Sequence, residues 1–150
     1  MDILYKKFSE DFLDSVTELE KTWVNENITY GIEQSGNDYF INADKNYFFI
    51  ALNQNRVIAY IICEIIDKNE NNIFPENSKF LSVNDLYVLK EYRNQGIGEK
   101  LLDKIENEAK NNGINHIFVS TATKDTDTVV RFYKRNGYKI WTTSLFKSIE

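Results

Sequence analysis

One segment of the chain combines residue types that suit anion binding at the start of a helix. It reads Leu86-Tyr87-Val88-Leu89-Lys90-Glu91-Tyr92-Arg93-Asn94-Gln95-Gly96-Ile97-Gly98, so an apolar strand runs into a loop that opens a helix with two glycines. The first N–H groups of a helix have no partner within it and lie at the positive end of its dipole. Residues 94 to 98 would therefore present N–H groups to a phosphate or pyrophosphate, and Arg93 can add a charged donor.

This segment differs from two well-known nucleotide-binding motifs. No Gly-Lys-Ser/Thr follows at the spacing of a Walker A loop, and Leu101 stands where a Gly-x-Gly-x-x-Gly pattern begun at Gly96 requires its third glycine. Two glycines in a strand-to-helix turn can also be purely structural. Without a further signal, the structural turn is the better interpretation.

The chain has one cysteine and one histidine, which restricts other kinds of chemistry. Cys63 lies in the apolar run 61–66 and is expected to be a small buried side chain rather than a nucleophile. His116 opens a predicted strand. One cysteine excludes an intramolecular disulfide framework and a Cys-rich zinc site, and one histidine excludes a two-His metal site, so we expect no metal.

The elements that must position this turn follow from hydrophobic periodicity and turn residues. Their predicted order is β-α-(α)-β-β-β-α-β-α-β, and Ser9 is expected to cap the first helix. The predicted strands are residues 2–6, 47–52, 56–66, 80–88, 114–120 and 138–146, and the predicted helices are residues 9–23, 38–43, 96–112 and 127–136. Residues 67–79 read as a surface loop. The unit from 80 to 120 should be parallel and the hairpin from 47 to 66 antiparallel, which predicts an α/β fold with a mixed sheet and helices on both faces.

Composition indicates one folded domain over residues 1–150. The chain is 42% hydrophobic and 27% charged, with a net charge of −5, six glycines and one proline. These values exclude disordered and collagen-like classes, and the acidic balance does not favour nucleic-acid binding. The N-terminus has no apolar signal region, and no stretch approaches the ~18 apolar residues of a membrane span. We therefore expect a cytoplasmic protein that binds neither nucleic acid nor membrane.

Two motifs together resemble those of the GNAT acetyltransferase superfamily. Arg93-x-x-Gly96-x-Gly98 after a Leu-Tyr-Val strand is similar to motif A, written Gln/Arg-x-x-Gly-x-Gly/Ala. Phe132-Tyr133-Lys134-Arg135-Asn136-Gly137-Tyr138 is similar to the Phe-Tyr-x-x-x-Gly-Phe/Tyr of motif B. The spacing between the motifs and the predicted strand order also fit. The resemblance covers about residues 47 to 140.

The resemblance implies acetyl-CoA as the donor. Its pyrophosphate would lie on the N–H groups from Arg93 to Gly98, and its pantetheine arm would follow the strand near Leu86 to Val88 as an added strand. The sheet would splay beyond Val88. The family often has an Asn where this chain has Thr126, with Asp127 next to it, and either could replace that side chain. The donor-binding residues so predicted are Leu86, Tyr87, Val88, Arg93, Asn94, Gln95, Gly96, Ile97, Gly98 and Thr126.

Two catalytic roles follow from the same resemblance. Tyr133 is the candidate general acid that protonates the leaving thiolate, because a phenol and a thiol have neighbouring pKa values. Asp85 is the first choice for the base that deprotonates the acceptor, with Glu26 and Glu33 as alternatives. The acceptor pocket could include Trp23, Tyr30 and Tyr87, and a core role is equally compatible with each.

The predicted activity is direct acetyl transfer from acetyl-CoA to an amine of a small molecule, which the acidic balance suggests is cationic, or of a protein. The alternative is a non-catalytic acyl-CoA-binding or regulatory module with the same fold, which would need neither Tyr133 nor a nearby carboxylate. A homodimer is compatible with the family, but no pattern in the sequence predicts one.

Overall fold

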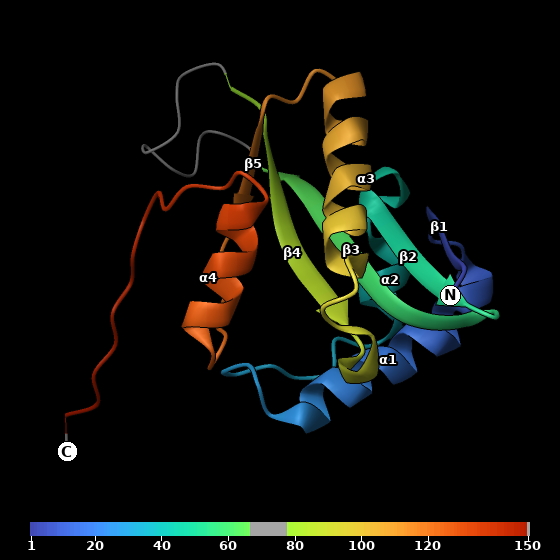
Figure 1. Ribbon diagram of the computed structural model, residues 1–150, viewed down its shortest axis with the longest axis horizontal. Helices are drawn as coiled ribbons and strands as arrows, with labels where there is room; N and C mark the ends of the chain where they lie inside the picture. Colours follow the sequence, from blue (N-terminus) through green and yellow to red (C-terminus); the bar gives the residue numbers. More distant parts are fainter. Residues whose placement is uncertain (67–77, 150) are drawn as a thin grey trace.

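The computed structural model describes residues 1–66 and 78–149, in which five strands form one twisted sheet (Figure 1). The strand order is β1-β2-β3-β4-β5, antiparallel except for the parallel pair β4 and β5. The strands are β1 Ile3–Lys7, β2 Phe48–Asn53, β3 Arg56–Ile66, β4 Phe80–Val88 and β5 His116–Val119. The helices are α1 Leu13–Glu26, α2 Asn37–Asn42, α3 Ile97–Asn111 and α4 Thr126–Arg135, with 3-10 turns η1 Glu10–Phe12, η2 Lys45–Tyr47 and η4 Lys90–Tyr92. The predicted mixed sheet is confirmed.

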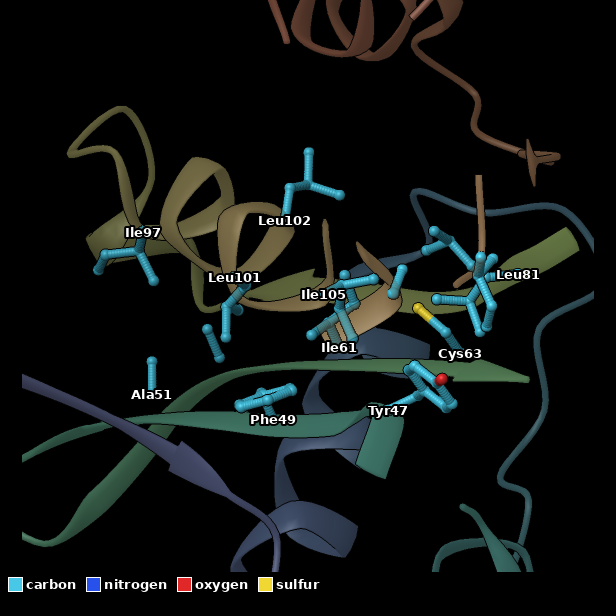
Figure 2. Close-up of a cluster of buried hydrophobic side chains, with 14 of the residues drawn as sticks. Tyr47, Phe49, Ala51, Ile61, Cys63, Leu81, Ile97, Leu101, Leu102 and Ile105 are labelled. Carbon is cyan, nitrogen blue, oxygen red and sulfur yellow. The ribbon is translucent and has the colours of Figure 1, made fainter. Parts of the chain in front are cut away.

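Helices cover both faces of this sheet, and a separate cluster of buried apolar side chains lies on each face. On one face, α3 presents apolar side chains at helical spacing, Ile97, Leu101, Leu102, Ile105 and Ala109, against alternate residues of β2, β3 and β4 (Figure 2). Tyr133 of α4 packs against the same cluster. On the other face, Val16 and Leu19 of α1 and Phe40 of α2 meet the intervening residues of the strands. The two layers hold β4 between them, so side chains on that strand project either toward α3 or toward α1 and α2.

A β-bulge in β4 decides which of its side chains project to which side. Ile62 pairs with Asp85 and Cys63 pairs with Val83, so Asn84 is one extra residue on β4. Before the bulge, the odd-numbered residues Leu81 and Val83 face α3. After the bulge, the even-numbered residues Leu86 and Val88 face α3. Because neighbouring side chains alternate along a strand, the extra residue places Asp85 and Tyr87 on the side of α1 and α2.

The parallel pairing of β4 with β5 is short. It joins Phe80–Val83 to His116–Val119, so residues 84–88 of β4 have no partner on that side among the described residues. We predicted that β4 would separate from its neighbour beyond Val88. In the structure, β4 and β5 separate after Val83, five residues earlier. The reason is that β5 ends at Val119, and the bulge at Asn84 interrupts the ladder at the same level.

Two local predictions were wrong. The Ser9 side chain makes no capping hydrogen bond, and a 3-10 turn, η1, lies between Ser9 and α1. The predicted strand at 138–146 is not a strand in the structure. Beyond α4 the chain continues without strand pairing and leaves the body of the molecule beyond the β5 edge (Figure 1). The predicted loop at 67–79 falls mostly outside the described residues.

Candidate active site

The turn that precedes α3 has the geometry of an anion site. Asn94 and Gly96 both have left-handed backbones, with φ of 59° and 77°, and the first helical hydrogen bond runs from Lys100 N–H to the Gly96 carbonyl at 3.0 Å. The N–H groups of residues 97–99 therefore have no acceptor within the helix. No atom from outside the turn lies within 4 Å of where a Cβ on Gly96 would be. The turn thus offers open N–H donors and room for a ligand.

Gly98 has a different reason to be glycine. A Cβ at this position would lie 3.2 Å from the ring of Phe132 and 3.8 Å from Val88. The absence of a side chain lets α3 pack closely against α4. Gly96 therefore allows the turn, and Gly98 allows α3 to pack against α4, the helix that carries Tyr133.

The Asp85 carboxylate lies in the splayed part of β4 and accepts a hydrogen bond from the Tyr39 hydroxyl of α2 at 2.8 Å. Burial raises the pKa of the Asp85 carboxyl to about 6, the Tyr39 hydrogen bond opposes this shift, and the charge of Glu20 adds to it. A carboxyl with this pKa is mostly ionised at pH 7 and takes up a proton more readily than an exposed aspartate. Burial and Asp85 together raise the pKa of Tyr39, so Tyr39 remains a donor.

Two further polar groups lie on the same side of the sheet. Glu20 of α1 is buried, and its carboxylate accepts from the Ser35 N–H at 3.1 Å and from the Ser35 hydroxyl. Tyr60 of β3 is fully buried, and its hydroxyl has no hydrogen-bond partner among the residues that the structure describes. Burial and then the charges of Asp85 and Glu20 raise the pKa of Tyr60. Within the described residues, none of the ion pairs includes Glu20 or Asp85, so this part of the interior carries uncompensated negative charge.

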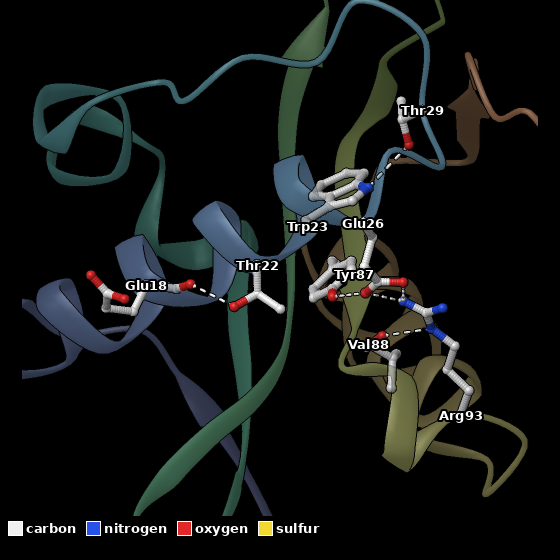
Figure 3. A network of polar contacts seen from close by, with 8 residues as sticks. All are labelled: Glu18, Thr22, Trp23, Glu26, Thr29, Tyr87, Val88 and Arg93. Carbon is white, nitrogen blue, oxygen red and sulfur yellow. Dashed lines mark hydrogen bonds and ion pairs between the residues drawn. The ribbon is translucent and has the colours of Figure 1, made fainter.

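Arg93 joins the start of the turn to the end of α1 (Figure 3). Its Nε donates to the Val88 carbonyl at 2.8 Å, and its Nη2 donates to both oxygens of Glu26 at 2.8 and 3.0 Å. The Tyr87 hydroxyl also donates to Glu26, and the Trp23 ring stacks on Tyr87 with centroids 5.2 Å apart. We predicted the Arg93 side chain as a phosphate donor, and that role stays a prediction; in the structure the side chain donates to Val88 and Glu26.

The loop after α1 is joined to the loop after β5. Tyr30 N–H donates to the Ala122 carbonyl at 2.8 Å, and Lys124 N–H donates to the Ile28 carbonyl at 2.9 Å. Thr29 pairs with Thr123 in an isolated bridge, and its hydroxyl accepts from the Trp23 indole at 3.0 Å. These loops therefore meet across the end of the sheet where β4 and β5 diverge. Tyr30 is 66% exposed, and Glu33 is also exposed.

Tyr133 lies on the α3 side of the sheet, opposite the side that carries Asp85. Its ring packs edge-on against Phe132 and Tyr138, with centroids 5.1 and 5.3 Å away. Burial, and then the neighbouring Cys63, raise the pKa of Tyr133, so it remains a protonated phenol over the ordinary pH range. Burial also raises the pKa of the Cys63 thiol, which keeps it from acting as a thiolate nucleophile.

Thr126 is the first residue of α4 and is exposed. The residue before it, Asp125, caps the helix by accepting from the Thr128 N–H at 3.2 Å. Asp127 lies in the same exposed first turn, so the structure does not distinguish it from Thr126 as the replacement for the family Asn. In residues 1–66 and 78–149, no group of three or more His, Cys, Asp or Glu side chains is arranged to hold a metal ion. No helix in these residues has the length and apolar character needed to span a membrane.

Comparison with known proteins agrees with this geometry. The family described as "Acetyltransferase (GNAT) family" matches residues 4–138. This chain belongs to the GNAT acetyltransferase family. An N-alpha-acetyltransferase 30 of Schizosaccharomyces pombe is 30% identical over 100 residues, 67% of this chain and 62% of the relative. An N-alpha-acetyltransferase 60 of Xenopus tropicalis is 24% identical over 91% of this chain and 60% of the relative. The GNAT chain thus spans less than two thirds of the length of these relatives.

Solved structures with the same fold cover almost the whole GNAT chain. The structure of AAC(6')-Iy with the bisubstrate analogue CoA-S-monomethyl-acetylneamine has a TM-score of 0.75 at 15% identity, covering 100% of this chain and 99% of that one. A transcriptional regulator from Bacillus halodurans C-125 has a TM-score of 0.74 at 18% identity, covering 99% and 100%. At these identities the likeness establishes the fold and leaves the activity open.

Sequence reasoning located the turn and the two motifs, but it missed part of the site in this GNAT domain. Tyr39 was assigned only to a short helix, and Tyr60 only to a strand. Glu20 was counted within the acidic balance. Nothing in the local sequence marks these residues, because each gains its role from contacts between α1 or α2 and the sheet. The one signal in the sequence is that residues 56–66, whose apolar composition is typical of a buried strand, include Tyr60.

Proposed function

We propose that this GNAT domain is an acetyl-CoA-dependent N-acetyltransferase that transfers the acetyl group directly to an amine. The observation that carries the proposal is the splay of β4 from β5, with a donor-rich turn at one end of the splayed strand and the Asp85 carboxylate within it. AAC(6')-Iy, which shares the fold, has been solved in complex with CoA. The N–H groups of residues 94–98 would hold the pyrophosphate, and residues 86–88 would pair with the pantetheine arm.

The two catalytic residues act from opposite faces of the sheet. Asp85 accepts a proton from the acceptor ammonium, directly or through water, and the resulting neutral amine attacks the thioester carbonyl. Tyr133 keeps its phenol proton over the ordinary pH range and donates it to the leaving sulfur as the carbon–sulfur bond breaks. Cys63 takes no part, which supports direct transfer over a covalent enzyme intermediate.

Charge on the acceptor side favours a cationic small molecule. Glu20 is buried and Asp85 is partly buried, and neither carboxylate belongs to an ion pair among the described residues. An ammonium placed here would offset the cost of burying two carboxylates. The stacked Trp23 and Tyr87 rings supply an apolar wall that could lie against the carbon skeleton. Protein N-termini remain the second candidate class, because the N-alpha-acetyltransferase relatives are named for them.

Thiol release from acetyl-CoA tests this proposal. The panel should hold spermidine, an aminoglycoside, free lysine and a short peptide with a free N-terminus, each assayed with wild type, Asp85→Asn and the surface control Asp103→Asn. We expect amine-dependent release with wild type and Asp103→Asn, and a loss of ~10²-fold or more with Asp85→Asn. Calorimetric binding of acetyl-CoA with no release for any amine would support the non-catalytic module. The absence of acetyl-CoA binding would refute both.

A further inference from the structure

The Asp85 carboxylate on β4 is held by a side chain from the short helix α2. Its Oδ2 atom accepts from the Tyr39 hydroxyl at 2.8 Å, across 46 positions of the chain. Among the residues that the structure describes, no other group donates to this carboxylate, so Oδ1 has no donor there. A carboxylate oxygen accepts through its lone pairs, and those of Oδ1 are therefore available for a proton.

The helix α2 has a fixed place on the sheet although it is too short to be stable alone. It contains six residues, and an isolated helix shorter than ~12 residues is marginal in water. Just before α2, Ser35 donates its N–H to both Glu20 oxygens at 3.1 Å, and its hydroxyl donates to Glu20 as well. The Thr17 hydroxyl donates to the Asn37 side chain at 3.3 Å, and Phe40 is fully buried. Contacts with α1 and with the core therefore determine where α2 lies.

Glu20 is a costly residue if its one role is to hold Ser35. Its side chain is buried and belongs to no ion pair in residues 1–66 and 78–149, so its charge loses water without gaining a cation. A neutral glutamine could accept the same hydrogen bonds from Ser35 without that cost. The charge of Glu20 also acts on the Asp85 carboxyl. Glu20 therefore affects Asp85 in two ways, by its charge and by the position that it gives to α2.

We propose that Tyr39 is a positioning residue that fixes one oxygen of Asp85 and leaves the other to take the acceptor's proton, and that the Glu20–Ser35 contact holds Tyr39 in place. This inference rests on the proposed function, in which Asp85 is the base. In that step an N–H bond of the acceptor ammonium breaks and its proton moves to Oδ1. The nitrogen keeps the electron pair, with which it attacks the thioester carbonyl. Without the Tyr39 hydroxyl the carboxylate can rotate, and less of it is oriented for this transfer.

Tyr39 and Glu20 affect the titration of Asp85 in opposite directions. Burial is the largest cause of the raised pKa of Asp85, the Tyr39 hydrogen bond lowers this pKa because it favours the ionised form, and the Glu20 charge raises it. Two titratable groups of β3, Tyr60 and Cys63, also lie near Asp85. Burial and then the Asp85 charge raise the pKa of both, so both stay neutral over the ordinary pH range. Changes to Tyr39 and Glu20 should therefore produce shifts of opposite sign.

Carbon-13 NMR of the Asp85 carboxyl, titrated in the free protein, tests the contact without turnover. Tyr39→Phe should move the midpoint to higher pH, and Glu20→Gln should move it to lower pH. Two control variants should leave it unchanged, Tyr5→Phe, which removes a phenol hydroxyl from β1, and Glu18→Gln, which removes an exposed charge from α1. A midpoint that stays the same in folded Tyr39→Phe, or that moves equally in Tyr5→Phe, would overturn the proposal.

The pH dependence of kcat, measured with an amine that wild type accepts, tests the positioning itself. Tyr39→Phe should lower kcat by about tenfold or more, leave the KM for acetyl-CoA within twofold, and move the acid limb to higher pH. General loosening of the fold would not move that limb. Glu20→Ala removes the anchor of Ser35 and should lower kcat by a similar factor. Because both act through one hydroxyl, the double variant should lose no more than the larger single loss.

The remaining outcomes separate this inference from the proposed function. A kcat of Tyr39→Phe within threefold of wild type, or losses that multiply in the double variant, would overturn the positioning role. If Glu20→Ala does not fold, Ser35→Ala takes its place in the double variant and should give the same result. A wild type that acetylates no amine would refute the proposed function, whereas the NMR titration would still decide whether Tyr39 holds Asp85.

Discussion

Replacing Asp85 with asparagine should stabilise the fold at neutral pH while it removes activity. The carboxyl is largely buried, and its pKa is raised from 3.8 to about 6. At about 1.36 kcal/mol per pKa unit, keeping this group ionised above pH 6 costs the folded state as much as ~3 kcal/mol. Asparagine has nearly the same shape, can still accept from the Tyr39 hydroxyl and carries no charge. At neutral pH the free energy of unfolding of Asp85→Asn should therefore exceed that of wild type by most of this ~3 kcal/mol.

The stabilisation should depend on pH in a defined direction. Between about pH 4 and pH 6 the folded wild type holds a proton on Asp85 that the unfolded chain has released, so the stability of wild type falls as the pH rises through this range. Above pH 6, Asp85 is ionised in both the folded and the unfolded state, so the stability of wild type falls no further. The advantage of Asp85→Asn should therefore grow by about 1.4 kcal/mol between pH 5 and pH 8. Urea unfolding of both proteins at the two pH values measures it.

Two measurements distinguish the pH-dependent stabilisation by Asp85→Asn from a general increase in the free energy of unfolding. Asp103→Asn removes a carboxylate from an exposed position of α3 and should show no pH-dependent difference from wild type. In the acetyl-transfer assay, wild-type kcat should rise with pH through about 6, as the base becomes ionised. An equal advantage of Asp85→Asn at pH 5 and pH 8 would show that the folded pKa is not raised. Activity of Asp85→Asn within threefold of wild type would refute its role as the base.

Three further predictions follow from the site. Tyr133→Phe should lower kcat by about 10²–10⁴-fold with little change in CoA affinity, and because burial raises the pKa of Tyr133, wild type should show no activity loss from its ionisation below about pH 10. Gly96→Val should weaken CoA binding in calorimetry by about tenfold or more while circular dichroism stays native, since φ of 77° strains a branched residue and its side chain occupies open space at the turn. Arg93→Ala should lower the free energy of unfolding by about 2 kcal/mol, because it leaves the Glu26 carboxylate without its cation, and adding Glu26→Gln should restore most of that loss in thermal unfolding.

Segments whose own residues determine their conformation were predicted well. The strands at 56–66 and 80–88 are β-branched or aromatic runs bounded by turn residues, and the structure has them with the same limits. α3 shows a clear helical period, and the turn before it depends on a glycine with positive φ, which leaves a visible mark in the sequence. The roles of the turn and of Tyr133 depend on family motifs and stay predictions.

Features that depend on contacts between distant residues could not be predicted. The Glu26–Arg93 pair joins positions 67 apart, and the Tyr39–Asp85 hydrogen bond joins positions 46 apart. Neither has a local pattern, because each depends on where α1 and α2 lie on the sheet. The predicted strand at 138–146 shows the opposite case. Its residues favour a strand, but a strand requires a hydrogen-bonded neighbour, and the described residues provide none for it.

The bulge at Asn84 makes the local geometry of β4, rather than the identity of any residue, a determinant of the site. If this exposed residue entered the ladder as an ordinary strand residue, every position after it would be inverted, so that the Asp85 carboxylate would enter the apolar layer under α3 and Leu86 would face α1 and α2. Deleting Asn84 would not have this effect, because Asp85 would then follow Val83 directly and would still project to the opposite side of the sheet. The face of the sheet that carries the carboxylate therefore depends on Asn84 staying outside the ladder.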